Sequence, residues 1–358
     1  MRGNFCNLLG VNPLAPLGIL YGLAMDVRNR MYDRGVLRSY ALGARTISIG
    51  NLTAGGTGKT PLVALTAKIL AENGEKVCVL TRGFGRADER ERVLVSDGEL
   101  VLADAAAGGD EPVELARKLI GKAVVVADAD RVGAGRWAAE KFGITAFVLD
   151  DGFQHRRARR DLDIVCIDAT DPFGNGRIIP AGTLREPFKE LRRADIIVIT
   201  RANLVDSVEP LVGKLRKQNP HSAIFEAETR ISGITKLEDF AAGRATPEDD
   251  EDRQFLASPL VFSGIGSPEN FRRSLEMENF RPAGFRAFRD HHRYTQRDID
   301  RLVEEAERLP AGSLMTTAKD AVKLDGLRSS IPIFVVETEV AISDEERFRR
   351  FVLAIGDG

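Results

Sequence analysis

A glycine-rich segment that ends in Gly58-Lys59-Thr60 has the residue types needed to bind a nucleoside triphosphate. An apolar run at residues 46–49 precedes the segment, and a helical pattern follows it. Glycines let backbone N–H groups close around phosphate oxygens, and the start of the helix adds unpaired N–H groups and a positive dipole. In such loops the lysine contacts the β- and γ-phosphates and the next hydroxyl binds Mg²⁺. The predicted binding segment is Thr53, Ala54, Gly55, Gly56, Thr57, Gly58, Lys59 and Thr60.

One position departs from the usual spacing, because Thr53 stands where the first glycine of the loop is expected. A tight strand-to-helix turn without a ligand is the alternative interpretation. The run Gly-Gly-Thr-Gly-Lys-Thr between a strand pattern and a helix pattern favours phosphate binding.

Two adjacent aspartates, Asp150 and Asp151, follow the apolar run at residues 147–149. Enzymes with such a loop hold Mg²⁺ with a carboxylate at the end of a strand, so we expect one of this pair to be a metal ligand. An Asp-Gly turn with capping carboxylates is the simpler alternative. Asp168 also follows directly after an apolar strand pattern, so the sequence leaves it as an alternative ligand for Mg²⁺.

Asp110 opens a predicted helix at residues 111–119. It is either the N-cap of that helix or a general base that accepts the proton of an attacking hydroxyl. His291, in a late Asp-His pair, has the chemistry to orient such a base. Because the two residues are far apart in the sequence, the residues alone do not favour their pairing.

Arginines supply candidate partners for phosphate. Arg82 follows a predicted strand at residues 77–80, and Arg185 lies in Gly-Thr-Leu-Arg-Glu-Pro. The basic run His155-Arg-Arg-Ala-Arg-Arg160 is either a solvated surface or a contact for an anionic substrate. Lys319-Asp320 does not have the residue order of a guanine-reading element.

Short apolar runs alternate with helical patterns through most of the chain, and this predicts how the candidate residues are positioned. Parallel strands alternating with helices give an α/β fold with helices on both faces, and its ligands bind at the carboxyl ends of the strands. A second α/β segment begins near residue 259. The expected strands are residues 77–80, 124–127, 147–150, 163–167 and 196–200, then 223–234 as a connector and 259–266, 313–317 and 333–336; the expected helices are residues 62–72, 111–119 and 131–141.

The composition sets limits on the function. The chain has 358 residues and a net charge of −2, so no overall field attracts nucleic acid, and we expect no nucleic-acid partner. Its length suggests more than one domain. Cys6, Cys78 and Cys166 are widely spaced, and we interpret the last two as buried free thiols.

The first 45 residues combine apolar residues with six arginines and only two aspartates. The apolar run at residues 13–25 is too short for a confident membrane span. A helix lying in the bilayer interface and a helix packed on the protein's own core both fit this pattern.

The motifs together resemble the tetraacyldisaccharide 4'-kinase family, the lipid A 4'-kinases. They occur in the family's order and cover most of the chain. A tyrosine is commoner in the family at Phe84, and the acidic stretch near Asp250 resembles a local insertion. The matching motifs are Gly-Asn-Leu-Thr-Ala-Gly-Gly-Thr-Gly-Lys-Thr-Pro, Thr-Arg-Gly-Phe-Gly, Gly-Asp-Glu-Pro, Asp-Asp-Gly-Phe-Gln-His, Gly-Thr-Leu-Arg-Glu-Pro, Asp-His and Lys-Asp-Ala-Val-Lys.

This resemblance implies a P-loop NTPase-like kinase that uses ATP and Mg²⁺ to phosphorylate the 4'-hydroxyl of a tetraacyldisaccharide 1-phosphate, a lipid A precursor. It implies Asp110 as catalytic base with His291 as its partner, and peripheral binding to the cytoplasmic face of an inner membrane. We also expect a monomer. The expected parts are a membrane-interface helix at 1–35, a P-loop kinase core at 36–225, connector strands and an insertion at 226–256, and a C-terminal α/β subdomain at 257–358.

Two other classes of protein have the same phosphate loop and strand-end aspartate as a lipid kinase. A nucleotide-dependent switch or maturation ATPase would hydrolyse ATP without a lipid acceptor, and it would not need the apolar amino end. A soluble ligase for a small molecule is the third possibility. Phosphorylation that depends on the lipid acceptor distinguishes all three.

Overall fold

A computed structural model describes residues 13–244 and 255–354 of the chain. Cys6 and the acidic stretch at residues 248–252 lie outside the described residues. Cys78 and Cys166 are buried free thiols, as the sequence predicted.

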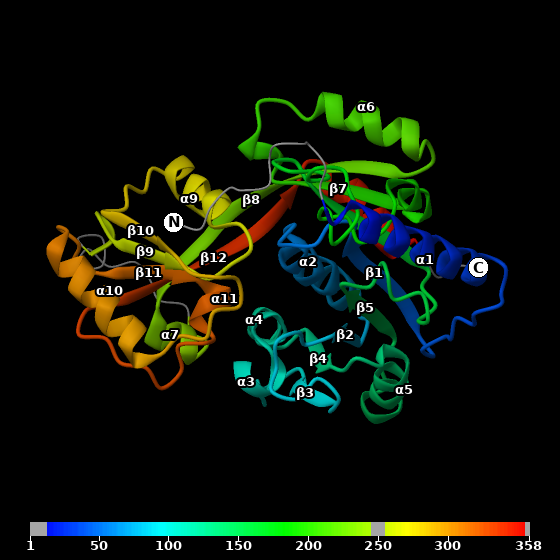
Figure 1. Ribbon diagram of the computed structural model, residues 1–358. Coiled ribbons are helices and arrows are strands. Elements are labelled where there is room, and N and C mark those ends of the chain that lie inside the picture. Colours follow the sequence, from blue (N-terminus) through cyan, green and yellow to red (C-terminus); the bar gives the residue numbers. More distant parts are fainter. Residues whose placement is uncertain (1–12, 245–254, 355–358) are drawn as a thin grey trace.

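One sheet of 12 strands runs through the molecule in the order β10-β9-β11-β12-β8-β7-β6-β1-β5-β2-β4-β3 (Figure 1). Along this order the strands from β7 to β4 are parallel, and β3 adds an antiparallel edge that the sequence did not predict. The predicted strands of this half are confirmed. Their bounds are β1 Arg45–Asn51, β2 Val77–Thr81, β3 Val93–Ser96, β4 Ala123–Ala127, β5 Ala146–Asp150, β6 Leu162–Asp168 and β7 Ile196–Thr200.

Helices cover both faces of this half because the buried strands alternate their side chains between two apolar layers. Val79 packs in the layer with α2 and α4, whereas Leu80 packs in the layer with α5. A further cluster lies under η1 and α6. The bounds are α2 Lys59–Glu72, α3 Ala105–Gly108, α4 Asp110–Lys118, α5 Arg131–Phe142, η1 Phe188–Arg193, η2 Ala202–Leu204, α6 Glu209–Gln218 and α12 Glu345–Leu353.

A long two-stranded ribbon joins this half to the C-terminal half. β8 (Ala223–Lys236) starts parallel to β7 and then continues antiparallel to β12 (Ile333–Ile342). In Figure 1 the ribbon crosses the middle of the molecule. The sequence predicted residues 223–234 as a connector strand, and β8 has that position.

The C-terminal half repeats the α/β arrangement on a smaller scale. β10, β9, β11 and β12 are parallel to one another, with α9 and α10 packed in separate apolar clusters. A hydrogen-bonded capping box begins α10, where Thr295 and Asp298 exchange side-chain bonds with each other's backbone N–H. The bounds are α7 Leu237–Ala241, β9 Leu260–Ser263, α9 Pro268–Met277, β10 Gly284–Ala287, α10 Gln296–Arg308, β11 Leu314–Thr317 and α11 Ala318–Ala321.

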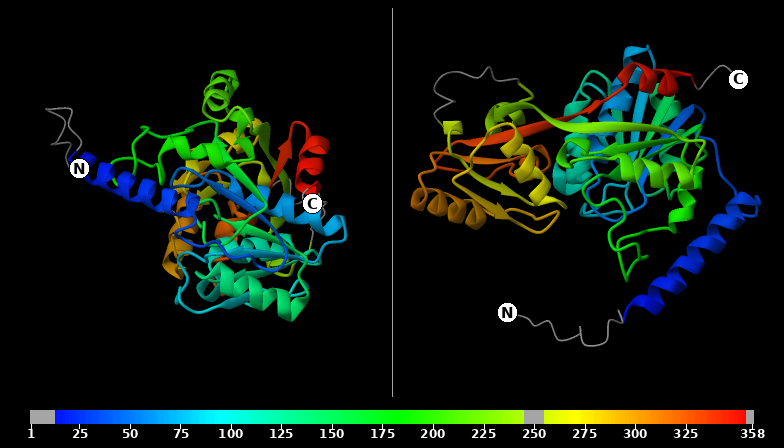
Figure 2. Two further views of the ribbon diagram at one scale, coloured as in Figure 1. Left: turned by 90° about the vertical axis from the view of Figure 1, so that its right-hand side faces the viewer. Right: turned by 90° about the horizontal axis from the view of Figure 1, so that it is seen from above.

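Helix α1 (Ala15–Asp33) stands out from the body of the molecule, with its first residues farthest away (Figure 2). Its buried positions are Gly18, Gly22 and Asn29. A Cβ on Gly18 would lie 2.9 Å from the carbonyl oxygen of Ile178, so glycine permits this close approach. The leucines and isoleucine of α1 are exposed, for example Ile19 at 64% and Leu20 at 63%. None of the described helices is both long enough and apolar enough to cross a bilayer.

Candidate active site

The phosphate loop opens onto a cavity of about 820 Å³. Seven of its eight predicted residues, 54–60, line this cavity, whereas Thr53 pairs with Leu184 instead. Gly58 precedes α2 with a φ of +74°, a left-handed conformation that favours glycine. The first turn of α2 therefore points its unpaired N–H groups toward the cavity, and Lys59 and Thr60 line its wall.

Asp151 lies between two cations at the end of β5. Its Oδ1 is 3.6 Å from Lys59 Nζ, and its Oδ2 accepts a hydrogen bond of 2.6 Å from Arg185. Burial alone would raise the pKa of Asp151, but Lys59 and Arg185 outweigh it and lower the pKa to about 2. Asp151 also has a φ of +53°, a conformation that few residues other than glycine adopt.

Asp150 ends β5, directly beside the strand that enters the loop. The register places it opposite Ile49 of β1. It is almost fully buried, and its Oδ2 accepts a hydrogen bond of 3.0 Å from Thr81. Burial, together with the carboxylates of Glu111 and Asp151, raises the pKa of Asp150. A divalent cation would relieve this repulsion.

The residues at this end of the cavity fit Mg²⁺. Carboxylate and hydroxyl oxygens are its preferred ligands, and Asp151 Oδ1 is a buried oxygen without a hydrogen-bond partner. Among residues 13–244 and 255–354, no three His, Cys, Asp or Glu side chains form a ready-made metal cage. That is expected for Mg²⁺, which keeps waters and substrate phosphates in its coordination shell. Thr60, Asp150 and Asp151 would hold it.

The rival aspartate, Asp168, is directed elsewhere. It forms an ion pair with Arg201 and accepts hydrogen bonds from Thr170, and it does not line the cavity. Of the two strand-end candidates, the geometry therefore favours the Asp150-Asp151 pair.

Asp110 and His291 are brought together although 181 residues separate them in the sequence. His291 Nδ1 donates to Asp110 Oδ2 at 2.8 Å and lies 3.1 Å from Oδ1. Asp110 is the first residue of α4, and Gly109 holds the N-cap position, so the N-cap alternative is wrong. Burial opposes ionisation of Asp110, but the hydrogen bond from His291 and the charge of Lys319 lower its pKa. Asp110 in turn raises the pKa of His291.

Strain also marks the His291 side of the site. His291 has a φ of +57°, and its backbone N–H donates to the carbonyl of Gly264 at 3.2 Å. Its ring contacts the edge of Phe84, with centroids 5.4 Å apart. Non-glycine residues in this region of backbone space cluster at functional sites, and Asp151 and Arg201 on the cavity wall share it.

Asp110 faces a smaller cavity, of about 200 Å³, beside the large one. Phe84 and His291 line both cavities, so the two cavities adjoin where His291 contacts Asp110. An acceptor hydroxyl at the border of the two cavities would meet Asp110 beside the space that the phosphates would occupy.

The two candidate arginines differ. Both line the cavity, but Arg185 is paired with Asp151, whereas Arg82 has 59% of its side chain exposed and lies 3.8 Å from Glu89. Of the basic run at 155–160, only His155 lines the cavity. Three arginines of that run pair within the protein: Arg156 with Asp33, Arg157 with Asp130 and Arg160 with Asp163.

Sequence reasoning missed the role of the Lys-Asp-Ala-Val-Lys motif, which it tested only against guanine recognition. Lys319 Nζ donates to Glu111 at 2.9 Å and to Asp290 at 3.2 Å, beside His291. Lys323 Nζ lies 3.8 Å from Asp110 Oδ2. The repeated lysine at four-residue spacing was the available signal, but only the fold shows what it faces.

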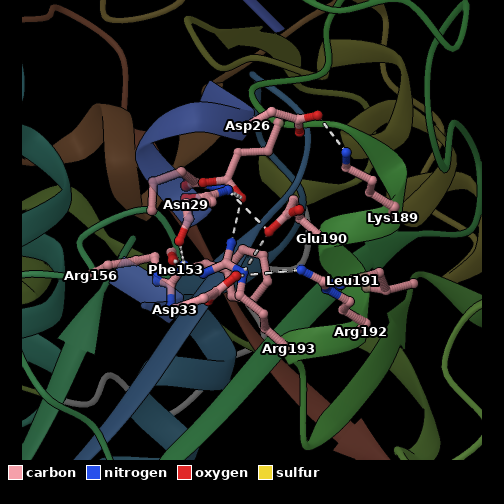
Figure 3. A network of polar contacts seen from close by, with 12 residues as sticks. Asp26, Asn29, Asp33, Phe153, Arg156, Lys189, Glu190, Leu191, Arg192 and Arg193 are labelled. Atoms are coloured by element: carbon pink, nitrogen blue, oxygen red, sulfur yellow. Dashed lines mark hydrogen bonds and ion pairs between the residues drawn. The ribbon is translucent and has the colours of Figure 1, made fainter. Parts of the chain in front are cut away.

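Helix α1 is joined to the loop that follows Asp151. Asn29 donates to Glu190 at 3.0 Å, and Arg193, which pairs with Glu186 and Glu190, donates to the carbonyl of Phe153 at 3.2 Å (Figure 3). Arg28 donates to the carbonyl of Gln154 at 2.8 Å. The apolar helix thus contacts the aspartate loop through a small polar face.

Comparison with known proteins identifies the family of the chain. Residues 11–356 match the family model described as tetraacyldisaccharide-1-P 4'-kinase. A tetraacyldisaccharide 4'-kinase of Syntrophus aciditrophicus is 37% identical, with 98% of this chain and 93% of the relative covered. One of Geobacter metallireducens is 39% identical, with 92% and 94% covered.

The fold comparison gives the same result. A crystal structure of LpxK from Aquifex aeolicus in complex with ATP superposes with a TM-score of 0.76 at 32% identity, covering 96% of this chain and 98% of that one. The resemblance drawn from the motifs and the expected α/β fold are therefore confirmed. The chain belongs to the tetraacyldisaccharide-1-P 4'-kinase family.

Proposed function

We propose that this protein transfers the γ-phosphate of ATP to the 4'-hydroxyl of a tetraacyldisaccharide 1-phosphate, the reaction named by its family. The observation that carries the proposal within the chain is that His291, which donates to Asp110, lines the same cavity as the phosphate loop. A kinase needs an acceptor base and a phosphate-binding loop on opposite sides of the reacting phosphorus.

On the acceptor side, Asp110 takes the proton of the sugar hydroxyl as the new O–P bond forms. The bond between the γ-phosphorus and the bridging oxygen breaks, and ADP leaves. His291 orients the carboxylate through its Nδ1–H. The low pKa of Asp110 keeps this base ionised at neutral pH.

On the nucleotide side, Lys59 and the amides of residues 54–60 hold the phosphates. Thr60, Asp150 and Asp151 would hold Mg²⁺, which neutralises charge on the phosphate oxygens when bound. Arg185 fixes Asp151, and Arg82, whose side chain is more than half exposed, would turn toward an anionic group in the cavity. Catalysis in this scheme comes from positioning and charge neutralisation.

Helix α1 is the proposed membrane contact. Leu17, Ile19, Leu20 and Leu23 are each more than half exposed, which is costly in water and favourable in the interface of a bilayer. Tyr21, Met25 and Arg28 of the same helix line the large cavity, so a lipid acceptor lying beside α1 would be within reach of the site. We propose a monomer bound peripherally to the cytoplasmic face of the inner membrane.

An acceptor-dependent phosphorylation assay tests this function. The protein is incubated with Mg-ATP, with and without detergent-dispersed tetraacyldisaccharide 1-phosphate, and phosphorylated lipid and ADP are both measured. We expect lipid product and ADP in equal amounts, and little ADP without the lipid. Rapid ATP hydrolysis without lipid would favour a switch ATPase and contradict the proposal.

A further inference from the structure

The pairing of Asp110 with His291 joins two halves of the molecule, and a second polar bridge lies beside it. Asp110 and its neighbour Glu111 begin α4 in the N-terminal half. His291 and Lys319 belong to the C-terminal half. Lys319 Nζ donates to Glu111 at 2.9 Å, so adjacent residues on α4 make adjacent contacts across the same boundary.

Lys319 also contacts the turn that carries His291. Its Nζ donates to Asp290 Oδ1 at 3.2 Å and lies 3.5 Å from His291 Nε2. Only 15% of the Lys319 side chain is exposed, so these contacts are shielded from water. An ammonium at this distance donates to an unprotonated Nε2 and repels a protonated one.

We propose that Lys319 is a positioning residue for phosphoryl transfer: it bridges Glu111 to the Asp290–His291 turn, holds His291 against Asp110 and limits protonation of the His291 ring. A ring that is neutral at Nε2 and carries its proton on Nδ1 remains a donor to Asp110 without adding a full positive charge. The carboxylate then keeps more of its basicity for the sugar proton. This inference depends on Asp110 being the base.

The charged groups that face the ring come from three places. Asp110 on α4 is the nearest, Asp290 precedes His291 in its own turn, and Lys319 reaches it from α11. Lys323 approaches Asp110 rather than the ring. Asp110 and Asp290 raise the pKa of His291, and Lys319 opposes them. Removing the lysine charge should therefore raise the pKa of His291 further.

The chain offers a matched control in Lys118. It is as well buried as Lys319, with 12% of its side chain exposed, and its Nζ lies 2.8 Å from Glu114 of the same helix. It also crosses to the other half, donating to the carbonyl of Thr338 at 3.2 Å. Lys118 does not line the cavity and does not face His291. Lys118→Met thus removes a comparable buried bridge without touching the histidine.

The test uses the full-length protein with Lys319→Met, Lys319→Arg and Lys118→Met. Lys319→Met should lower kcat about tenfold to a hundredfold with the KM for ATP nearly unchanged, since small misplacements at a reacting centre have effects of that size. Its acid limb of kcat against pH should move to higher pH. Lys319→Arg should restore most of kcat, and Lys118→Met should change kcat by less than about twofold.

A second readout does not depend on turnover. The ring pKa of His291 is measured by NMR in the ATP-free protein, and His291→Gln assigns its signal among the four histidines of the chain. We expect a higher pKa in Lys319→Met and no change in Lys118→Met. If Lys319→Met does not fold, Lys319→Gln replaces it in both measurements.

Several results would overturn the inference. These are unchanged turnover in Lys319→Met, an equal loss in Lys118→Met, an unmoved His291 pKa, or a rise in the KM for ATP that accounts for the whole loss, which would make Lys319 a nucleotide contact. A further variant, Asp110→Asn, shows whether only the role of Lys319 is wrong or the proposed function itself is wrong. If Asp110→Asn is inactive while Lys319→Met is normal, only the role of Lys319 is wrong.

Discussion

The two sides of the site are built in different ways. The nucleotide side comes from neighbouring strands of one sheet, where the register of β1 and β5 places Asp150 beside the start of the phosphate loop. The acceptor side joins Asp110 of α4 to His291 from the C-terminal half. Local pairing therefore fixes the first side, and packing between two halves fixes the second. We expect substitutions on the acceptor side to change turnover and those on the nucleotide side to change the use of Mg-ATP.

The largest effect should come from Asp110→Asn. This change removes the proposed base but keeps the shape of the side chain, so kcat should fall by about 10²- to 10⁴-fold. ATP affinity, measured by calorimetry, should be nearly unchanged because Asp110 does not line the large cavity. Retained turnover in this variant would contradict the assignment of Asp110 as the general base, and with it the contrast between the two sides of the site.

The next largest effect concerns the strand-end aspartates. Asp150→Asn or Asp151→Asn should lower the apparent affinity for Mg²⁺, measured from kcat/KM at increasing Mg²⁺ concentration, by at least about tenfold to a hundredfold. Losses of this size are seen even for residues that only support metal ligands. Asp168→Asn is the matched control, because Asp168 also ends a strand but does not itself line the cavity and is paired with Arg201. Equal losses in all three, measured in Mg²⁺ titrations of the kinase assay, would reopen the choice between them.

A smaller effect should follow from Asn29→Leu, which tests whether α1 supports the nucleotide side. Asn29 is 1% exposed and donates to Glu190, so its loss leaves a buried carboxylate without this donor. We expect the free energy of unfolding to fall by about 1–3 kcal/mol in chemical denaturation. The control, Leu20→Gln, alters an exposed position of the same helix and should change stability by about 0.5 kcal/mol or less.

Binding to vesicles separates the same two variants. Leu20→Gln should weaken sedimentation with vesicles of anionic phospholipid, because it removes apolar area from the exposed face of α1. Asn29→Leu leaves that face intact. Unchanged binding of a variant with Leu17, Leu20 and Leu23 all replaced by glutamine would contradict the proposed membrane contact.

The smallest effect concerns the pH dependence of the stability that the Asp110–His291 pair contributes. The pKa of His291 is raised in the folded protein, so its contribution to stability is complete below the unfolded value of about 6.5 and is lost as pH rises through the folded value. The difference in unfolding free energy between wild type and His291→Gln should therefore shrink between mildly acidic and alkaline pH. We expect about 1 kcal/mol or less. A difference that grows toward alkaline pH would have the wrong sign.

The sequence predicted the central elements well because their signals are local. The buried strands are apolar runs, and the loop motif needs only its own residues and the strand and helix beside it. Edge strand β3 was missed because half of its four residues are only partly buried and give no continuous apolar run. Helix α1 was assigned correctly as a helix, but its polar contacts through Asn29 and Arg28 depend on partners more than 120 residues away.

The amino-acid sequence by itself determined the phosphate loop, the strand-end aspartates and the family, since each depends on residue types at short spacing. Only the tertiary structure decided that Asp110 meets His291, that Asp168 turns away and that Lys319 crosses between the halves. The physical reason is that a contact over 181 residues depends on how the β8–β12 ribbon places one half against the other. No local pattern of charge or hydrophobicity encodes that placement.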